Sequence, residues 1–282
     1  MTGKVYLVGA GPGDPELLTF KAARLLRSAD VVLHDDLVGE KILQLVPAHA
    51  QIHNVGKRCG KKSVSQEVIN FLMVTLAASG FEVVRLKGGD PLIFGRIGEE
   101  IAALRQANIP FEIVPGITAA LGAAASTQIA LTHRHSSHAL VFIAGQTASG
   151  DDPADWRALV SLGATIVVYM PGSHYSKIAH KLRAAGLPDD TPCMIVSRAT
   201  TSEEQVYSTN IGNLGDAPRL ATPALLVVGE VVRHASHRFS LEGLGSLSFD
   251  AWDGWPSAEP SLVMQTKSPS SVTAFGEEEQ GA

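Results

Sequence analysis

Short apolar runs rich in β-branched residues alternate with segments whose apolar residues recur at helical spacing over the first 116 residues. The alternation predicts helices within 14–29, 63–80 and 98–109 and strands within 4–10, 30–38, 51–57, 81–91 and 110–116. This strand–helix–strand succession is typical of a largely parallel α/β sheet.

A second set of apolar runs follows a segment of small residues, 117–130, that joins the halves and is expected to pack closely as a helix. The predicted helix is 176–187, and the predicted strands are 137–146, 163–172, 191–200, 204–214 and 222–232. The fold class is therefore α/β, with domains at 1–116 and 117–240. Ser, Pro, Gly and Glu dominate residues 241–282, which predicts a disordered tail.

Composition and charge narrow the class of protein. The 282 residues are 45% hydrophobic and 18% charged, which is typical of a globular protein with a sizeable core. No long apolar run and no basic leader occur, so neither a membrane span nor a signal peptide is expected. Cys59 and Cys193 lack metal or redox spacing, which favours a reduced, cytoplasmic setting. The net charge of −5 disfavours a nucleic-acid binder.

The loop "GAGPGDP" after the first strand resembles a dinucleotide fingerprint, but its glycines are spaced Gly-x-Gly-x-Gly from Gly9. Pro12 removes a backbone N–H that a pyrophosphate needs, and Asp14 places a negative charge at the helix start. One interpretation is a tight turn with Asp14 as N-cap and Pro15 in the first helical position. The other is a glycine-lined surface for a ligand without phosphate.

The segment "RLKGGDPLIFGRIGEE" holds a second glycine loop at a strand end. Gly88 and Gly89 allow a ligand to approach the main chain. Asp90 is expected to be an unpaired carboxylate at the carboxyl end of the strand, where open α/β sheets bind ligands. Arg96 and Glu99 are three residues apart at a helix start, so they can share a face, and a surface ion pair is the alternative interpretation.

The order of these motifs resembles the tetrapyrrole methylase family over about residues 3–238, and within it the uroporphyrinogen-III C-methyltransferases. The segments that carry the resemblance are "VGAGPGDPELLT", "VVLHDDLV", "VGKRCG", "VVRLKGGDPLIFGR", "VPGITAA", "LTHR", "VVYM" and "TPALLVVGEVV". The resemblance implies a homodimer of two-domain α/β chains that bind S-adenosylmethionine in a cleft between the domains. It also implies methylation of uroporphyrinogen III at C2 and C7 to precorrin-2, for sirohaem, cobalamin or denitrification haem. The dehydrogenase–chelatase half of fused sirohaem synthases is expected to be absent.

The resemblance assigns site residues by position. The donor would contact Pro12, Gly88, Gly89, Asp90, Ile93, Thr118, Ala119, Met170, Ala199 and Ala224. Core packing is the alternative role of Met170, and close packing that of Thr118, Ala119 and Ala199. Because the acceptor carries eight carboxylates, cations are required. Lys57, Arg58, Lys61, Lys62, Arg96 and Arg134 are the candidates, although the lysine-rich loop is also typical of a solvated surface.

The chemistry is an in-line displacement at a sulfonium by a pyrrole carbon, followed by loss of a proton to a base. By resemblance Asp35 is the candidate proton acceptor and Lys57 a donor. Arg96, Glu99 and Arg134 would hold the acceptor, and Arg96 is also a candidate base. Asp35 can instead cap a turn or pair with a neighbouring lysine, and Asp36 is the less favoured of the two.

Several positions depart from the family pattern on the expected acceptor side: Ile97, Ser126, Gln128, Ala130 and Gln146. His133, His135 and His138 lack a completing ligand, so no metal is expected. Alternative functions are methylation of a later precorrin, a nicotinamide-dependent reductase, and a catalytically silent tetrapyrrole- or donor-binding protein. Pro12 and Asp14 argue against the reductase, and Asp35, Lys57 and Arg96 against the silent protein.

Overall fold

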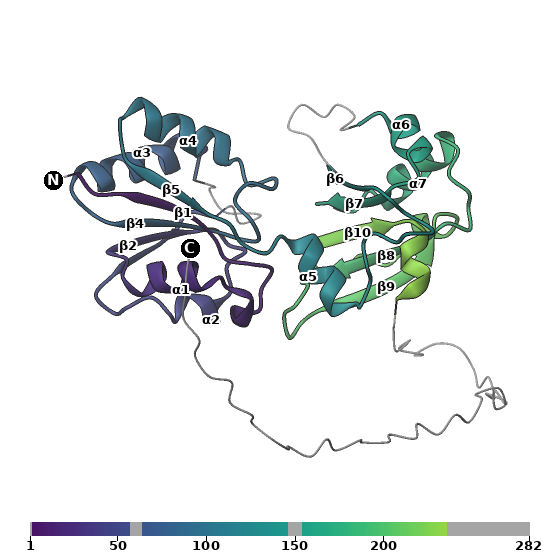
Figure 1. The fold of residues 1–282 in the computed structure, drawn as a ribbon, viewed down its shortest axis with the longest axis horizontal. Coiled ribbons are helices and arrows are strands. Elements are labelled where there is room, and N and C mark those ends of the chain that lie inside the picture. Colours follow the sequence, from purple (N-terminus) through teal and green to yellow (C-terminus); the bar gives the residue numbers. More distant parts are fainter. Residues whose placement is uncertain (1, 57–63, 146–153, 236–282) are drawn as a thin grey trace, which may run out of the picture. The chain divides into compact units, whose positions relative to one another are not determined.

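The computed structural model describes residues 2–56, 64–145 and 154–235. Within these ranges the chain forms two five-stranded sheets with helices packed on both faces of each (Figure 1). None of the helices in the described ranges is long and apolar enough to cross a membrane.

The first sheet has the strand order β3-β2-β4-β1-β5, and all of its neighbours are parallel. This agrees with the predicted alternation of strands and helices. The strands are β1 (Val5–Gly9), β2 (Val31–His34), β3 (Gln51–Asn54), β4 (Val83–Lys87) and β5 (Phe111–Val114).

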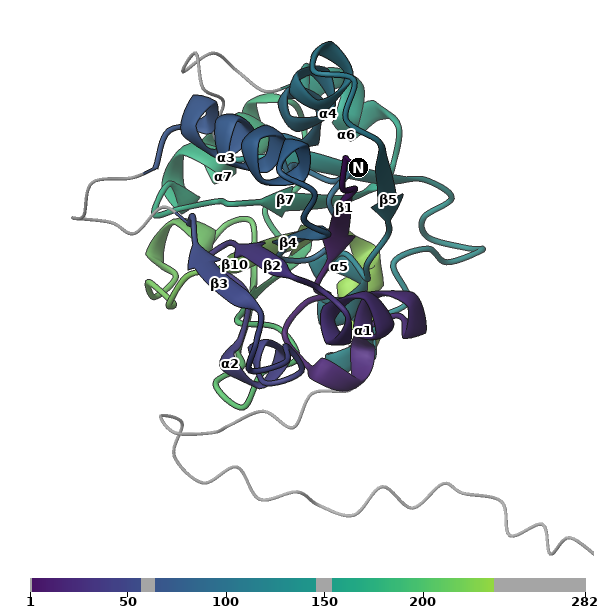
Figure 2. The same cartoon turned by 90° about the vertical axis from the view of Figure 1, so that its left-hand side faces the viewer.

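Successive residues of these strands pack on opposite faces of the first sheet. Val5 and Leu7 join a core cluster beneath two helices on one face, and Val8 joins the cluster on the other face. Figures 1 and 2 both show α3 (Gln66–Ala78) and α4 (Ile97–Gln106) over one face, with α1 (Phe20–Arg27) and α2 (Glu40–Leu43) over the other. Because both faces are buried there, β1 and β2 have nearly continuous apolar sequences, whereas the edge strand β3 is exposed along its length.

The second sheet has the order β6-β7-β10-β8-β9, and only β6 and β7 are parallel neighbours. It is therefore a mixed sheet. Its strands are β6 (Leu140–Ala144), β7 (Thr165–Tyr169), β8 (Pro192–Ser197), β9 (Gln205–Asn210) and β10 (Ala224–Val228). The connection between β8 and β9 is too short for a crossover helix, which dictates antiparallel pairing there.

Helices cover both faces of the second sheet as well. One core cluster includes residues of α6 (Trp156–Ser161) and α7 (Tyr175–Ala184). The opposite cluster includes residues of α5 (Ala119–Ser126) and of a 3-10 helix, η3 (Glu230–His234). The predicted small-residue helix is therefore present as α5.

One predicted helix is wrong in its extent. The pattern over 14–29 predicts a single helix beginning at Asp14, but Asp14 caps only a short 3-10 helix, η1 (Pro15–Leu17). Leu18 and Thr19 are extended, and the Thr19 side chain accepts a hydrogen bond from Ala22 N–H at 3.1 Å to start α1. Two capping side chains five residues apart thus break the segment.

The predicted domain boundary at residue 116 falls in the connection between β5 and α5. The division into two domains stays a prediction, and the predicted tail at 241–282 lies outside the described residues.

Candidate active site

The two glycine loops follow adjacent strands, and they join each other through the backbone. Gly11 N–H donates to Gly89 O at 3.1 Å, and Gly89 N–H donates to Gly11 O at 2.7 Å. Gly89 has φ +66°, a conformation that glycine adopts without strain. A Cβ on Gly9 would lie 2.6 Å from the Gly116 nitrogen, so three loops approach each other closely at these strand ends.

Three positions of the first loop offer no free N–H donor to a pyrophosphate. Gly11 N–H is engaged by Gly89, Pro12 has no N–H, and Asp14 N–H donates to Thr200 Oγ1 at 3.1 Å. The Asp14 carboxylate caps η1 by accepting from Glu16 N–H at 2.9 Å. The capped turn is therefore present, a phosphate ligand is disfavoured here, and the ligand without phosphate stays a prediction.

Asp90 is not the unpaired carboxylate that the sequence predicts. Its Oδ1 accepts from Leu92 N–H at 2.7 Å, and its Oδ2 accepts from Gly116 N–H at 2.9 Å. The first bond is an Asx turn formed with a residue two positions on, and the second ties the loop after β4 to the loop after β5. Asp90 therefore fixes the wall of the site, and the partner 26 residues away explains why sequence spacing missed it.

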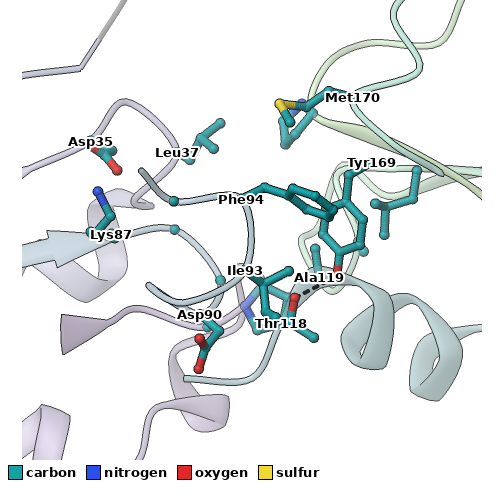
Figure 3. A pocket seen from close by; sticks show the side chains of 18 of the residues that line it. Asp35, Leu37, Lys87, Asp90, Ile93, Phe94, Thr118, Ala119, Tyr169 and Met170 are labelled. Atoms are coloured by element: carbon teal, nitrogen blue, oxygen red, sulfur yellow. Dashed lines mark hydrogen bonds between the residues drawn. The ribbon is translucent and has the colours of Figure 1, made fainter. Parts of the chain in front are cut away.

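All ten residues predicted to contact the donor line one cavity at the strand ends, which we call the first cavity (Figure 3). Met170 is 53% exposed there and has φ 51°, so it does not pack in a core. Thr118 and Ala199 are buried in the cavity wall. The predicted set comprises Pro12, Gly88, Gly89, Asp90, Ile93, Thr118, Ala119, Met170, Ala199 and Ala224.

Two members of an aromatic cluster that the sequence did not predict, Tyr169 and Phe94, line the first cavity. The Tyr169 ring lies 4.9 Å from that of Phe94 and 5.5 Å from that of Phe142, measured between centroids. The Tyr169 hydroxyl is 2.6 Å from Thr118 Oγ1 and accepts from Ala120 N–H at 3.1 Å. Burial raises the pKa of this hydroxyl. The only sequence signal was a tyrosine at the end of an apolar strand, directly before Met170.

A second, larger cavity adjoins the first and shares several wall residues with it, including Asp35, Lys87, Phe94 and Met170. Arg96 lines the second cavity from the N-cap position of α4, with φ 53°. Its Nε and Nη2 each donate to the Glu99 carboxylate at 2.8 Å, and both side chains are about half exposed. The ion pair considered from the sequence is therefore present.

Asp35 belongs to a buried network of charges between β4 and α4. Arg85 donates to Asp35 Oδ1 at 2.5 Å and to Glu100 Oε1 at 2.9 Å. Lys87 donates to the same Glu100 oxygen at 3.1 Å. Within the described residues Asp35 therefore pairs with an arginine of β4, and not with the neighbouring lysine considered from the sequence. Desolvation lowers the pKa of Lys87, with repulsion by Arg85 acting in the same direction. The sequence signal for this network is the apolar run "VVRLK", because Arg85 and Lys87 in a buried strand require buried carboxylate partners.

Some predicted residues are not brought to these cavities by the described structure. Lys57, Arg58, Lys61, Lys62 and Gln146 lie outside the described residues. Arg134 is exposed in the turn spanned by the His133–Ser137 bridge, and it is absent from the described lining of both cavities. The described ranges contain no cluster of three or more potential metal ligands. The roles of Lys57 and Arg134, and the expected absence of a metal, stay predictions.

Comparisons with known proteins agree on one family. A profile of the tetrapyrrole (corrin/porphyrin) methylases matches residues 4–215. A siroheme synthase of Nitrosococcus oceani is 48% identical over 233 residues, which cover 82% of this chain and 50% of the relative. The chain thus spans about half the length of the curated relatives it matches.

Two crystal structures of uroporphyrin-III C-methyltransferase from Thermus thermophilus are similar to this fold. The native form has a TM-score of 0.73 at 40% identity, covering 82% of this chain and 100% of that one. The form complexed with S-adenyl homocysteine has a TM-score of 0.72 at 39% identity, covering 82% and 94%. Because the family profile matches residues 4–215, most of the sequence, this chain belongs to the tetrapyrrole methylase family.

Proposed function

We propose that this chain transfers methyl groups from S-adenosylmethionine to C2 and C7 of uroporphyrinogen III and so forms precorrin-2. The observation that carries the proposal is the junction of two cavities at Asp35. The first cavity has the features of a donor site, and the second has the size and the arginine that a carboxylate-rich acceptor requires. A methyl group passing between them would cross this junction.

The first cavity suits a nucleoside without phosphate. Its wall is apolar at Pro12, Ile93, Ala119, Met170 and Ala199, which suits an adenine ring. Gly88 and Gly89 leave backbone accessible at one edge. In the first glycine loop the N–H groups of Gly11 and Asp14 are engaged and Pro12 has none, which disfavours the pyrophosphate of a nicotinamide cofactor. When bound, the sulfonium donor supplies an activated methyl group.

Arg96 is the cation that we propose for the acceptor carboxylates. It lines the second cavity, and two of its five donor hydrogens are engaged by Glu99. The remaining N–H groups can pair with a carboxylate in the planar geometry that arginine favours. Glu99 would hold the guanidinium in position for that contact.

Asp35 is the proton acceptor that we favour over Arg96. The hydrogen bonds from Arg96 to Glu99 raise the pKa of the guanidinium, which makes it a poor base. The Asp35 carboxylate is 25% exposed at the junction and is held by Arg85. It can therefore take the proton released from the macrocycle after the new carbon–carbon bond forms. Lys57 remains our candidate proton donor, and a homodimer our proposed assembly.

The experiment incubates the purified chain with S-adenosylmethionine and uroporphyrinogen III without oxygen and follows the mass of the tetrapyrrole. A gain of two methyl groups is expected, and no gain would contradict the proposal. A gain only when a later precorrin is supplied would favour the cobalamin-pathway alternative. Oxidation of a reduced nicotinamide by the same chain would favour the reductase.

A further inference from the structure

The N-terminus of α5 is capped from another strand instead of by its own N-cap side chain. Thr118 occupies the N-cap position, where a threonine hydroxyl ordinarily accepts a backbone N–H, but it makes no such bond. The Tyr169 hydroxyl at the end of β7 accepts Ala120 N–H at 3.1 Å instead. The Thr118 hydroxyl is thereby released from capping and lies in the wall of the first cavity.

The direction of the bond between the two hydroxyls follows from counting hydrogens. Tyr169 Oη already accepts Ala120 N–H and has one hydrogen to donate. Thr118 Oγ1 lies 2.6 Å from Tyr169 Oη and can accept that hydrogen. If Thr118 donated instead, the phenolic hydrogen would need another acceptor, and the described residues show none bonded to it. This favours Tyr169 as the donor and Thr118 as the acceptor.

With Tyr169 as the donor, the Thr118 hydroxyl keeps its own hydrogen for another acceptor, and this hydroxyl lies in the wall of the first cavity (Figure 3). We propose that Tyr169 is a positioning residue for the methyl donor: it caps α5 and orients the Thr118 hydroxyl to donate to an acceptor atom of the nucleoside or amino-acid part. The inference rests on the proposed function, because it concerns the same donor site.

The surroundings of Tyr169 hold the phenol in one orientation and in one protonation state. Its ring packs between Phe94 and Phe142, and the residue is 8% exposed. Burial raises the pKa of the hydroxyl, so it remains a donor at neutral pH. Phe94, in the loop after β4, lines the first cavity together with Tyr169, whereas Phe142 belongs to β6 and is not part of the described lining.

The test titrates the full-length chain with S-adenosylhomocysteine by calorimetry. Tyr169→Phe keeps the ring and removes the hydroxyl, which lets Thr118 return to capping its own helix. Affinity should fall about threefold to tenfold, the range of one net hydrogen bond. The matched control is Tyr175→Phe, at the other buried tyrosine with a raised pKa, which lies in the opposite core cluster. Its affinity should stay within about twofold of the wild type.

A double-mutant cycle separates positioning from general loosening of the fold. Thr118→Val should lose as much affinity as Tyr169→Phe, and the double variant should lose little more, because both remove the same contact. Thr118→Ser should retain affinity. Additive losses, or equal losses in Thr118→Ser and Thr118→Val, would overturn the inference. If Tyr169→Phe fails to fold, the comparison of Thr118→Ser with Thr118→Val decides.

The outcome for the unmodified chain keeps the two proposals distinguishable. If the unmodified chain does not bind S-adenosylhomocysteine, the proposed function fails and this inference fails with it. If it binds and Tyr169→Phe binds equally well, only the positioning role of Tyr169 is wrong.

Discussion

Arg85 donates from its Nε to Oε1 of Glu100 over 2.9 Å, and both side chains are almost completely buried. The pair continues to Asp35 through a second nitrogen of Arg85, and Lys87 donates to the same Glu100 oxygen. The proposed base is thus fixed by charges on β4 and α4 and not by its own loop. Removing a member of this network should affect stability and function differently.

Glu100→Gln should destabilise the protein by about 3–5 kcal/mol, because it leaves Arg85 and Lys87 buried with less opposing charge. Urea unfolding measures this loss. The matched control is Glu99→Gln. Glu99 directly precedes Glu100 in α4, and its ion pair with Arg96 is half exposed. It should cost less than about 1 kcal/mol. Equal losses of unfolding free energy in the two variants would contradict the claim that burial makes the Glu100 network stabilising.

Lys87 should impose a pH dependence on stability that Lys87→Met removes. Burial lowers the pKa of Lys87 in the folded state below the ordinary value of 10.5. Between that lowered pKa and 10.5 the unfolded chain binds more protons, so this residue makes stability rise with pH. Unfolding measured from pH 8 to 10.5 should show a more positive slope for the wild type than for the variant. Identical slopes would contradict the shift.

Arg96→Ala should reduce turnover about 10- to 100-fold, the range of a charged hydrogen bond to the acceptor, and leave S-adenosylhomocysteine affinity within twofold. Arg233→Ala is the matched control, because Arg233 pairs with Glu230 at the same spacing and similar exposure but lines neither cavity. It should retain full turnover. Unchanged turnover in Arg96→Ala would remove this arginine from the acceptor site.

Cys193 should be inert in the folded protein, because burial raises the pKa of its thiol to about 12. In a Cys59→Ser background, a thiol reagent at pH 8 should label the chain only after unfolding in urea. Labelling of the native protein at the rate of the unfolded chain would contradict the burial of β8.

The residues that line the first cavity could be named from the sequence through the family resemblance, because they follow strand ends in recognisable motifs. Parallel strands bring their carboxyl ends to one edge, so Gly89 and Pro12 meet although they are far apart in the chain. The apolar alternation likewise predicted the strands, since their burial is a property of each segment.

The features that the sequence could not predict depend on pairing across elements. In the sequence, Glu100 is indistinguishable from an exposed helical charge, because its partners Arg85 and Lys87 lie on a different element. In the sequence, Tyr169 is indistinguishable from a core residue, and only the fold shows that its hydroxyl accepts a hydrogen bond from the first turn of α5. The break at Thr19 depends on two competing caps, and spacing alone does not rank them.

The most direct test of the central claim supplies S-adenosylmethionine labelled with carbon-13 in its methyl group, together with uroporphyrinogen III, without oxygen. Carbon-13 NMR of the product should show two labelled methyl groups, one at C2 and one at C7. An unlabelled product, or label at other positions, would contradict the account.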